Sequence, residues 1–216
     1  MPPHAEIRVL LARHGATVWN AEHRIIGSTD LPLSAAGRAE AALIARRIAS
    51  ERPAVLYTSP LLRARQTAEM IAVVASCPVY VDERLRETDF GAWEGLTMAE
   101  AEKRDAAALA KWRADPSAAP TGGEAPDDMR TRVRCLLDDL RTRNAGQTVA
   151  LVGHGGVFQA LIFAALDLPF RNDWVFLLDN GSLSELALSG TRGWLVRLND
   201  TAHLAAAENG SEAYRS

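Results

Sequence analysis

The chain has 216 residues, of which 48% are hydrophobic, so it can bury one sizeable core, and we predict one domain with or without an insertion. The formal net charge of -3 excludes a general affinity for nucleic acid or an anionic membrane surface, so any positive site must be local. No apolar run approaches the roughly 18 residues that span a bilayer, and residues 1–6 lack a signal-peptide pattern. Cys77 and Cys135 form no C-x-x-C pair, which fits a reducing cytoplasm and predicts no disulfide framework.

The first pronounced element is an apolar run over residues 7–12, which predicts a strand covered on both faces. It leads into Arg13-His14-Gly15, where the glycine allows a tight turn and a close approach to a ligand. Ligands in open α/β sheets bind outside the carboxyl ends of the strands, so Arg13 and His14 mark a candidate anion site. A single histidine at a strand end is nevertheless more often a hydrogen-bonded structural residue than a nucleophile.

Helices and strands are predicted to alternate through the first half of the chain. The assignments rest on apolar residues at helical spacing, on a serine N-cap and on proline in the first turn of a helix. In chain order they are a helix from Ser34 to about Ser50, a strand over 53–57, a helix that starts at Ser59-Pro60, a strand over 77–81 and an irregular stretch over 84–93.

The middle of the chain contains a predicted lid. Thr97–Glu100 fits a capping box, which predicts a helix to about Trp112. The segment 115–128 is rich in Pro, Gly and Ala, and motifs of the core lie on both sides of it. We therefore predict a lid or insertion over residues 105–127, not a linker between domains, and a long helix over 128–143.

A second buried strand, over residues 148–153, ends in His154-Gly155-Gly156. The remaining predicted elements are a helix that includes 161–166, closing strands over 175–178, 184–188 and 194–198, and a flexible tail over 200–216, which leaves a single domain over 1–199. The alternation of strands and helices predicts an α/β fold of three layers (αβα), with a mostly parallel central sheet and helices on both of its faces.

Two strands that each end in His-Gly can bring two imidazoles together at one edge of the sheet. With these turns, and with the segments Ser59–Glu69 and Arg84–Gly95, residues from about 8 to about 188 resemble the histidine phosphatases, also called the phosphoglycerate mutase-like superfamily. Within the second segment, Glu87–Gly95 resembles the phosphatase branch more than the mutase branch. The resemblance implies the phosphoglycerate mutase-like fold and phosphoryl chemistry.

The resemblance also implies a role for each polar residue of the site. His14 has the position of the family's nucleophile, which attacks phosphorus and forms a phosphohistidine. Arg13 and Arg63 match phosphate-binding arginines, whose planar guanidinium groups suit two phosphate oxygens at once. His154 matches the second histidine, which stabilises the charged transition state.

Further positions complete the implied site. Gly155 offers a backbone N–H at a helix N-terminus, and Asn20 fits a family position that contacts phosphate. Glu87 matches the general acid, which protonates the leaving alkoxide and then activates water. Asp89 and Glu94 are the competing carboxylates.

The function implied by the resemblance is a histidine acid phosphatase-type phosphoric monoester hydrolase, active on a small phosphorylated metabolite without metal or cofactor. We expect no nucleic-acid or membrane partner and a cytoplasmic location, and a homodimer is compatible with the sequence. Three alternatives stay open: a cofactor-dependent phosphoglycerate mutase, a non-catalytic phosphoryl-binding module, and a metal site built on His14 and His154.

The sequence does not select a substrate. Many family members carry Gly-Glu-Ser after the insertion, whereas this chain reads Gly122-Gly123-Glu124-Ala125, so a lid or substrate contact can differ. Esters of sugars, sugar acids, amino-acid derivatives and nucleosides, including α-ribazole phosphate, all fit the family. Three tryptophans are candidates for a pocket wall, although core packing is the commoner role: Trp19, Trp93 and Trp112.

Overall fold

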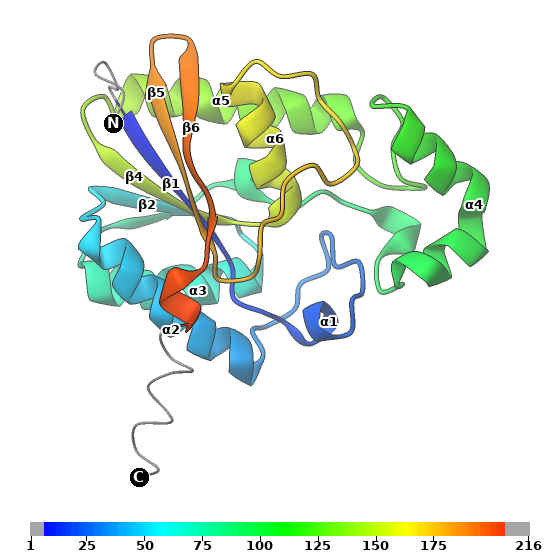
Figure 1. The fold of residues 1–216 in the computed structure, drawn as a ribbon, viewed down its shortest axis with the longest axis horizontal. Helices are drawn as coiled ribbons and strands as arrows, with labels where there is room; N and C mark the ends of the chain where they lie inside the picture. Colours follow the sequence, from blue (N-terminus) through cyan, green and yellow to red (C-terminus); the bar gives the residue numbers. More distant parts are fainter. Residues whose placement is uncertain (1–6, 206–216) are drawn as a thin grey trace.

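The computed structural model describes residues 7–205 (Figure 1). Within this range six strands form one sheet in the order β3-β2-β4-β1-β5-β6. The strands are β1 (Ile7–Arg13), β2 (Val55–Thr58), β3 (Val79–Val81), β4 (Thr148–Gly153), β5 (Leu183–Ser189) and β6 (Arg192–Asp200). Strands β3, β2, β4 and β1 run parallel to one another, whereas β5 pairs antiparallel with β1 and β6 pairs antiparallel with β5. The predicted α/β fold with a mostly parallel sheet is confirmed.

Helices cover both faces of the sheet (Figure 1). The helices of the described residues are α1 (Val18–Ala21), α2 (Ala35–Ser50), α3 (Leu62–Ala75), α4 (Met98–Ala114), α5 (Pro126–Arg143) and α6 (Gly155–Ala165), with 3-10 turns η1 (Glu83–Leu85) and η2 (Gly91–Trp93). Helices α2 and α3 pack on one face, and α5 and α6 pack on the other. The arrangement is the three-layer sandwich that the alternating elements predict.

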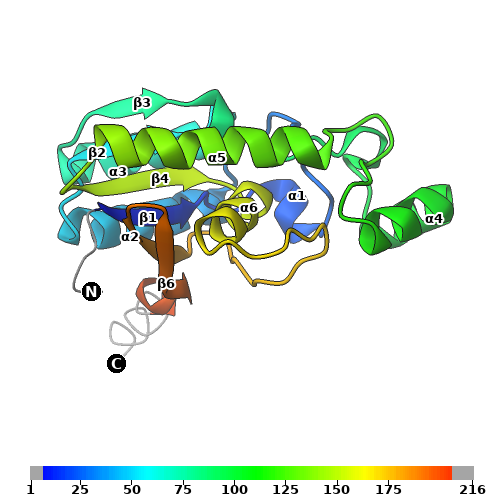
Figure 2. The same ribbon diagram turned by 90° about the horizontal axis from the view of Figure 1, so that it is seen from above.

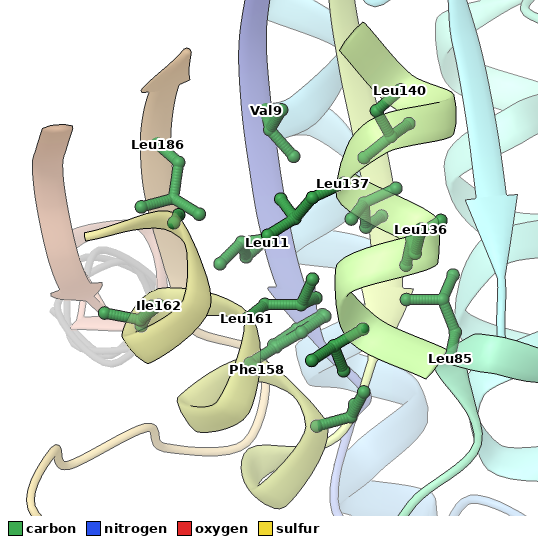
Figure 3. Packing of buried hydrophobic residues seen from close by; sticks show 14 of the residues in the cluster. Val9, Leu11, Leu85, Leu136, Leu137, Leu140, Phe158, Leu161, Ile162 and Leu186 are labelled. Carbon is green, nitrogen blue, oxygen red and sulfur yellow. The ribbon is translucent and has the colours of Figure 1, made fainter. Parts of the chain in front are cut away.

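The continuous apolar runs of β1 and β4 follow from this layering. Along a strand, successive side chains point to opposite faces. In β1, Leu10 and Ala12 therefore join the core under α2 and α3, whereas Val9 and Leu11 join the core under α5 and α6 (Figure 3). Both faces are buried, so no polar alternation appears in the sequence.

A third, smaller core lies apart from the sheet, around α4 (Figure 2). Trp93, Leu109 and Trp112 are its large buried residues. Helix α4 begins with the predicted capping box, in which the Thr97 side chain accepts from the Glu100 N–H. The helix is kinked at Asp105, whose φ is -150°. The predicted lid thus starts at this kink, and its role as a lid stays a prediction.

Two element assignments from the sequence are wrong. The helix expected from Ser59-Pro60 begins at Leu62, because Leu61 still has an extended backbone. The strand expected over 175–178 is an irregular connection. Its apolar character misled the prediction, since Leu177 is 77% exposed.

The chain after the sheet and the ends of other elements also differ in detail. Residues 200–205 were expected to start a flexible tail, but Asp200 ends β6 and residues 202–205 form a helical turn. The rest of the predicted tail, 206–216, lies outside the described residues. Helix α5 starts two residues earlier than predicted, at Pro126, because proline fits the first turn of a helix. Within residues 7–205, no helix combines the length and apolar character needed to cross a bilayer.

Candidate functional site

The carboxyl ends of β1 and β4 bring two histidines together. The two strands are parallel neighbours with Arg13 opposite Gly153, so the residues that follow them emerge side by side. The rings of His14 and His154 lie 5.0 Å apart between centroids, at an angle of 57°. Both are buried, with 2% and 0% of their surface exposed. The predicted pairing of the two His-Gly turns is confirmed in the structure.

The hydrogen bonds of His14 fix which nitrogen is free. Its Nδ1 lies 2.7 Å from the carbonyl oxygen of Gly15, and because a carbonyl only accepts, Nδ1 carries the proton. The lone pair is then on Nε2, which accepts from Nε of Arg63 at 3.3 Å. Burial, and then the charges of Arg63 and Arg13, hold the pKa of His14 well below its usual value of 6.5. His14 is therefore a neutral imidazole with an available nitrogen.

Gly15 allows the close packing that this turn needs. An ideal Cβ at this position would lie 2.1 Å from the carbonyl oxygen of Gly37 in α2, so no side chain fits there. The backbone N–H of Gly15 donates to the hydroxyl of Thr67 in α3 at 3.2 Å. The turn that carries His14 is thus clamped between two helices.

Arg63 enters the cluster from the first turn of α3 and is only 1% exposed. Its two terminal nitrogens donate to the carbonyl oxygens of Thr29, at 2.8 Å, and Gly27, at 2.7 Å. Burial lowers the pKa of Arg63 to about 10. The guanidinium is therefore still charged at neutral pH, directly beside His14.

Arg13 and His154 each leave a buried polar atom without a partner. The terminal nitrogen NH1 of Arg13 donates to the carbonyl oxygen of Leu178, whereas its Nε has no partner among the described residues. His154 Nε2 lies 2.8 Å from the Ser59 hydroxyl, and its Nδ1 likewise lacks a partner within the described chain. Leaving such a group unsatisfied costs about 1–3 kcal/mol, so both atoms suit a polar ligand.

The charge state of His154 adds to this picture. Burial, followed by the charge of Arg63, holds its pKa well below 6.5, so the ring is neutral at pH 7. When the Ser59 hydroxyl donates to Nε2, the proton of the neutral ring is on Nδ1, the atom without a partner. Two cations and a neutral ring donor then lie around the neutral imidazole of His14, which is an arrangement suited to an anion.

Glu87 is the carboxylate that lies at this cluster. It is 8% exposed and accepts from the backbone N–H groups of Gly156, at 3.0 Å, and Val157, at 3.1 Å, in the first turn of α6. Its charge acts on both Arg13 and Arg63. An ideal Cβ on Gly156 would lie 2.5 Å from Glu87 Oε1, so the glycine makes room for the carboxylate.

The two competing carboxylates have other tasks. Asp89 accepts from the Gly91 N–H at 2.8 Å and so closes a local turn. Glu94 binds the backbone of the loop at Ser28 and Thr29. Neither makes a hydrogen bond to a histidine or arginine of the cluster within residues 7–205.

The two remaining predicted contacts flank the cluster. Asn20 Oδ1 accepts from the backbone N–H of Thr17 at 2.9 Å, and Asn20 lines the same cavity as Arg13. Gly155 begins α6, and an ideal Cβ there would lie 3.9 Å from the guanidinium carbon of Arg13. The structure therefore gathers all seven candidate site residues around one end of the sheet.

A cavity of about 450 Å³ opens beside Arg13 and Asn20. A smaller recess lies beside Gly156. Three aromatic side chains line both hollows: Phe90, Trp112 and Trp174. Of the tryptophans singled out from the sequence, Trp93 and Trp112 are buried in the third core and also line the larger cavity.

Sequence reasoning missed three residues of the site. Trp174 stands over Gly155, with its ring 3.0 Å from the ideal Cβ position of the glycine. Asn180 donates to the carbonyl oxygen of His14 at 3.1 Å. Ser59, which faces His154, belongs to a segment that the resemblance had already marked, but the other two lie in a connection without a recognisable motif.

The geometry does not favour the alternative of a metal site. Within the described part of the chain, no group of three or more His, Cys, Asp or Glu side chains is placed to hold a metal ion. The charged groups nearest to the histidines are instead Arg63 and Arg13, which repel a cation.

The chain is similar to known phosphatases along most of its length. A profile described as "Histidine phosphatase superfamily (branch 1)" matches residues 9–201. A glucosyl-3-phosphoglycerate phosphatase of Mycolicibacterium vanbaalenii is 37% identical over 190 residues, covering 85% of this chain and 84% of the relative. A probable phosphoglycerate mutase of Photorhabdus laumondii is 34% identical over 208 residues, covering 92% and 95%. The structure of a mycobacterial glucosyl-3-phosphoglycerate phosphatase with VO3 matches with a TM-score of 0.81 and 35% identity, over 90% of this chain and 99% of that one.

Proposed function

Because the chain belongs to the histidine phosphatase superfamily (branch 1), we propose that it hydrolyses a small phosphate monoester through a phosphohistidine on His14, without a metal ion. The observation that carries the proposal is the neutral His14 Nε2, which accepts from buried Arg63 and is also acted on by the charge of partly buried Arg13. A phosphoryl group needs cations around its equatorial oxygens, a nucleophile on one side and an acid on the other. The cluster offers a candidate for each of these needs.

In the first step, Nε2 of His14 forms a bond to phosphorus while the bond from phosphorus to the ester oxygen breaks. Glu87 gives its proton to the leaving oxygen, which departs as an alcohol. Arg13, Arg63 and Nδ1 of His154 bind the phosphoryl oxygens and stabilise the charge that develops on them. The N–H of Gly155 at the start of α6 favours the same charge.

In the second step, water attacks the phosphohistidine. The oxygen of water bonds to phosphorus, the bond to His14 breaks, and Glu87 takes the proton that the water loses. Inorganic phosphate is released, His14 is again a neutral imidazole, and Glu87 again carries the proton that it gave up in the first step. Two displacements at one histidine therefore return the site to its starting state, so no cofactor is consumed.

The leaving group is proposed to carry a ring. The support comes from Phe90, Trp112 and Trp174, which line both hollows beside the phosphoryl site. Aromatic faces stack on flat or ring-shaped groups and bury a large area on doing so. Esters of sugars and nucleosides are thus better candidates than esters of short open chains, and glucosyl-3-phosphoglycerate enters the panel because of the relatives named above.

The test is phosphate release from such a panel in the presence of EDTA. We expect wild-type turnover of at least one ester, a loss of about 10³-fold or more in His14→Ala, and an acid-labile phosphate on the quenched wild-type protein only. Activity that disappears in EDTA would overturn the metal-free mechanism. Full activity in His14→Ala would overturn the role of this histidine.

A phosphoglycerate mutase is the second candidate, because a probable mutase is among the relatives. Such an enzyme returns the phosphoryl group to a sugar acid instead of to water. It predicts that a bisphosphate primer is needed and that little phosphate is released. Phosphoryl exchange with a primer, without net hydrolysis, would replace the phosphatase reading with this one.

A further inference from the structure

The loop over residues 27–30 sets the orientation of Arg63. The carbonyl oxygens of Gly27 and Thr29 accept from the two terminal nitrogens of its guanidinium. With these nitrogens held, the third, Nε, faces His14. The same loop caps α3, since Asp30 Oδ1 accepts from the Leu62 N–H at 2.6 Å. Any shift of this loop therefore moves the charge that lies beside the nucleophile.

The carboxylate of Glu94 also binds this loop. Glu94 accepts from the backbone N–H groups of Ser28, at 2.7 Å, and Thr29, at 3.0 Å. It also accepts from the hydroxyl of Ser28, at 3.0 Å, and from the hydroxyl of Thr29. A fifth donor is the backbone N–H of Phe90, at 3.1 Å. Four of the five donors to Glu94 thus belong to the loop.

The conformation of Gly27 and its lack of a side chain leave room for this carboxylate. Its φ of +57° lies in the left-handed region, which glycine adopts without strain. An ideal Cβ on Gly27 would lie 2.1 Å from Oε1 of Glu94, so the carboxylate occupies the space that a side chain would need. The loop and Glu94 are therefore fitted to each other at the residue whose carbonyl binds Arg63.

We propose that Glu94 is a positioning residue, which acts through residues 27–29 to hold the Arg63 guanidinium in its phosphoryl-binding orientation. The inference rests on the proposed function, in which Arg63 binds the phosphoryl oxygens. Within the described residues Glu94 makes no hydrogen bond to His14 or Arg63, so its contacts reach the guanidinium through the loop, while its charge also acts on Arg63 directly. Substitution by Gln keeps its size but places an amide N–H₂ against donors, so at least part of the loop loses its acceptor.

The test is a double-mutant cycle on the binding of inorganic phosphate, measured by titration calorimetry with the full chain. We expect Glu94→Gln to weaken phosphate binding about tenfold, as loss of an outer-shell partner does for metal ligands. In an Arg63→Ala background, the same substitution should cause no further loss. Equal losses in both backgrounds would overturn the proposal, as would unchanged binding in Glu94→Gln alone.

Two further variants keep the result interpretable. Glu51→Gln is the matched control, since Glu51 is a partly buried carboxylate that pairs with Arg8 and Arg47 at the other end of the sheet, and it should leave phosphate binding unchanged. Thr29→Val removes one hydroxyl donor to Glu94 at nearly constant size and keeps the charge of Glu94, so it separates the loop contact from the direct action of that charge on Arg63 and also serves where Glu94→Gln does not fold. The loss of phosphate affinity caused by Thr29→Val should likewise be absent in the Arg63→Ala background. A loss of affinity that persists in that background would overturn the proposal.

The outcome of this double-mutant cycle can be distinguished from the outcome of the test of the proposed function. Phosphate binding requires no turnover, so the coupling between Glu94 and Arg63 is measurable even if His14→Ala retains activity. Conversely, the experiments can show that hydrolysis depends on His14 while Glu94 and Arg63 contribute independently to phosphate binding. That result would support the phosphatase mechanism and overturn only this inference. A merely structural Glu94 would lower the melting temperature without this dependence on Arg63.

Discussion

The two sides of the site are built in different ways. The phosphoryl side consists of buried groups at the ends of β1, β4 and α3, and His14, Arg63 and His154 each have at most 2% of their surface exposed. The proposed leaving-group side consists of aromatic residues outside the sheet, on connections and on α4, among which Trp174 is 51% exposed. The proposed chemistry therefore belongs to groups held by the packed sheet, whereas the surface proposed to meet the rest of the substrate lies on segments that can vary without disturbing the two cores that flank the sheet.

The largest expected effect is on the phosphoryl side. Arg63→Ala removes a buried charge that faces the nucleophile, so we expect kcat/KM to fall about 10²–10³-fold, as when a group that stabilises transition-state charge is deleted. The matched control is Arg65→Ala, two residues further along α3, which removes an exposed arginine. Steady-state kinetics on the best ester measures both. Similar losses in the two variants would contradict the assignment of Arg63.

The same burial predicts an acid-sensitive fold. The pKa values of His14 and His154 are held well below 6.5 in the folded protein, whereas both histidines titrate near 6.5 once unfolded. Below about pH 6.5 the unfolded chain therefore binds more protons than the folded one. The stability that is complete above this pH is lost as the pH falls toward the lowered values, by about 1.4 kcal/mol per pH unit for each histidine.

Urea unfolding at several pH values between 7.5 and 5.5 measures this loss. We expect His154→Asn to reduce the slope of stability against pH, because one of the two buried histidines is then absent. An unchanged slope in this variant would mean that His154 does not carry the effect.

The phosphoryl side was easier to predict from the sequence than the leaving-group side, because it is built on buried strands. Strands β1 and β4 are buried on both faces, so their apolar runs are continuous and their His-Gly ends are easy to recognise. The apolar run at 175–178 looked like another strand but is an irregular connection, in which Leu177 is exposed whereas Leu178 reaches the core. A short apolar run indicates hydrophobic residues, and it does not show whether their backbone pairs with a neighbouring strand.

The choice of Glu87 as the proposed acid also needed more than the local sequence. Glu87, Asp89 and Glu94 lie within eight residues, and residue type alone does not separate them. Their hydrogen-bond partners separate the three carboxylates, but the deciding partners lie far away in the chain. Glu87 binds the N-terminus of α6, and Glu94 binds the loop at Ser28. The resemblance ranked Glu87 first, and only the fold explains what the neighbouring carboxylates do instead.

An intermediate effect is expected on the leaving-group side. Trp174→Ala removes an aromatic wall next to Gly155 and Arg13, so KM should rise about tenfold for an ester with a ring, equivalent to about 1.4 kcal/mol of lost contact. Ethyl phosphate, whose leaving group has no ring to stack on the wall, should be hydrolysed as before. Trp194→Ala on β6 is the control. A uniform loss for both esters would place Trp174 on the phosphoryl side instead.

The smallest effect concerns Ala125, where many family members carry serine. Ala125 is the N-cap of α5, and no side chain there accepts from the helix N-terminus. Ala125→Ser should supply this acceptor and raise the free energy of unfolding by about 1 kcal/mol, which corresponds to roughly 2–4 °C in melting temperature. Kinetics on the best ester then decides whether the residue matters beyond stability. A higher melting temperature with unchanged kcat/KM would assign the serine of the relatives to helix capping, whereas a changed KM would assign it to the leaving-group side.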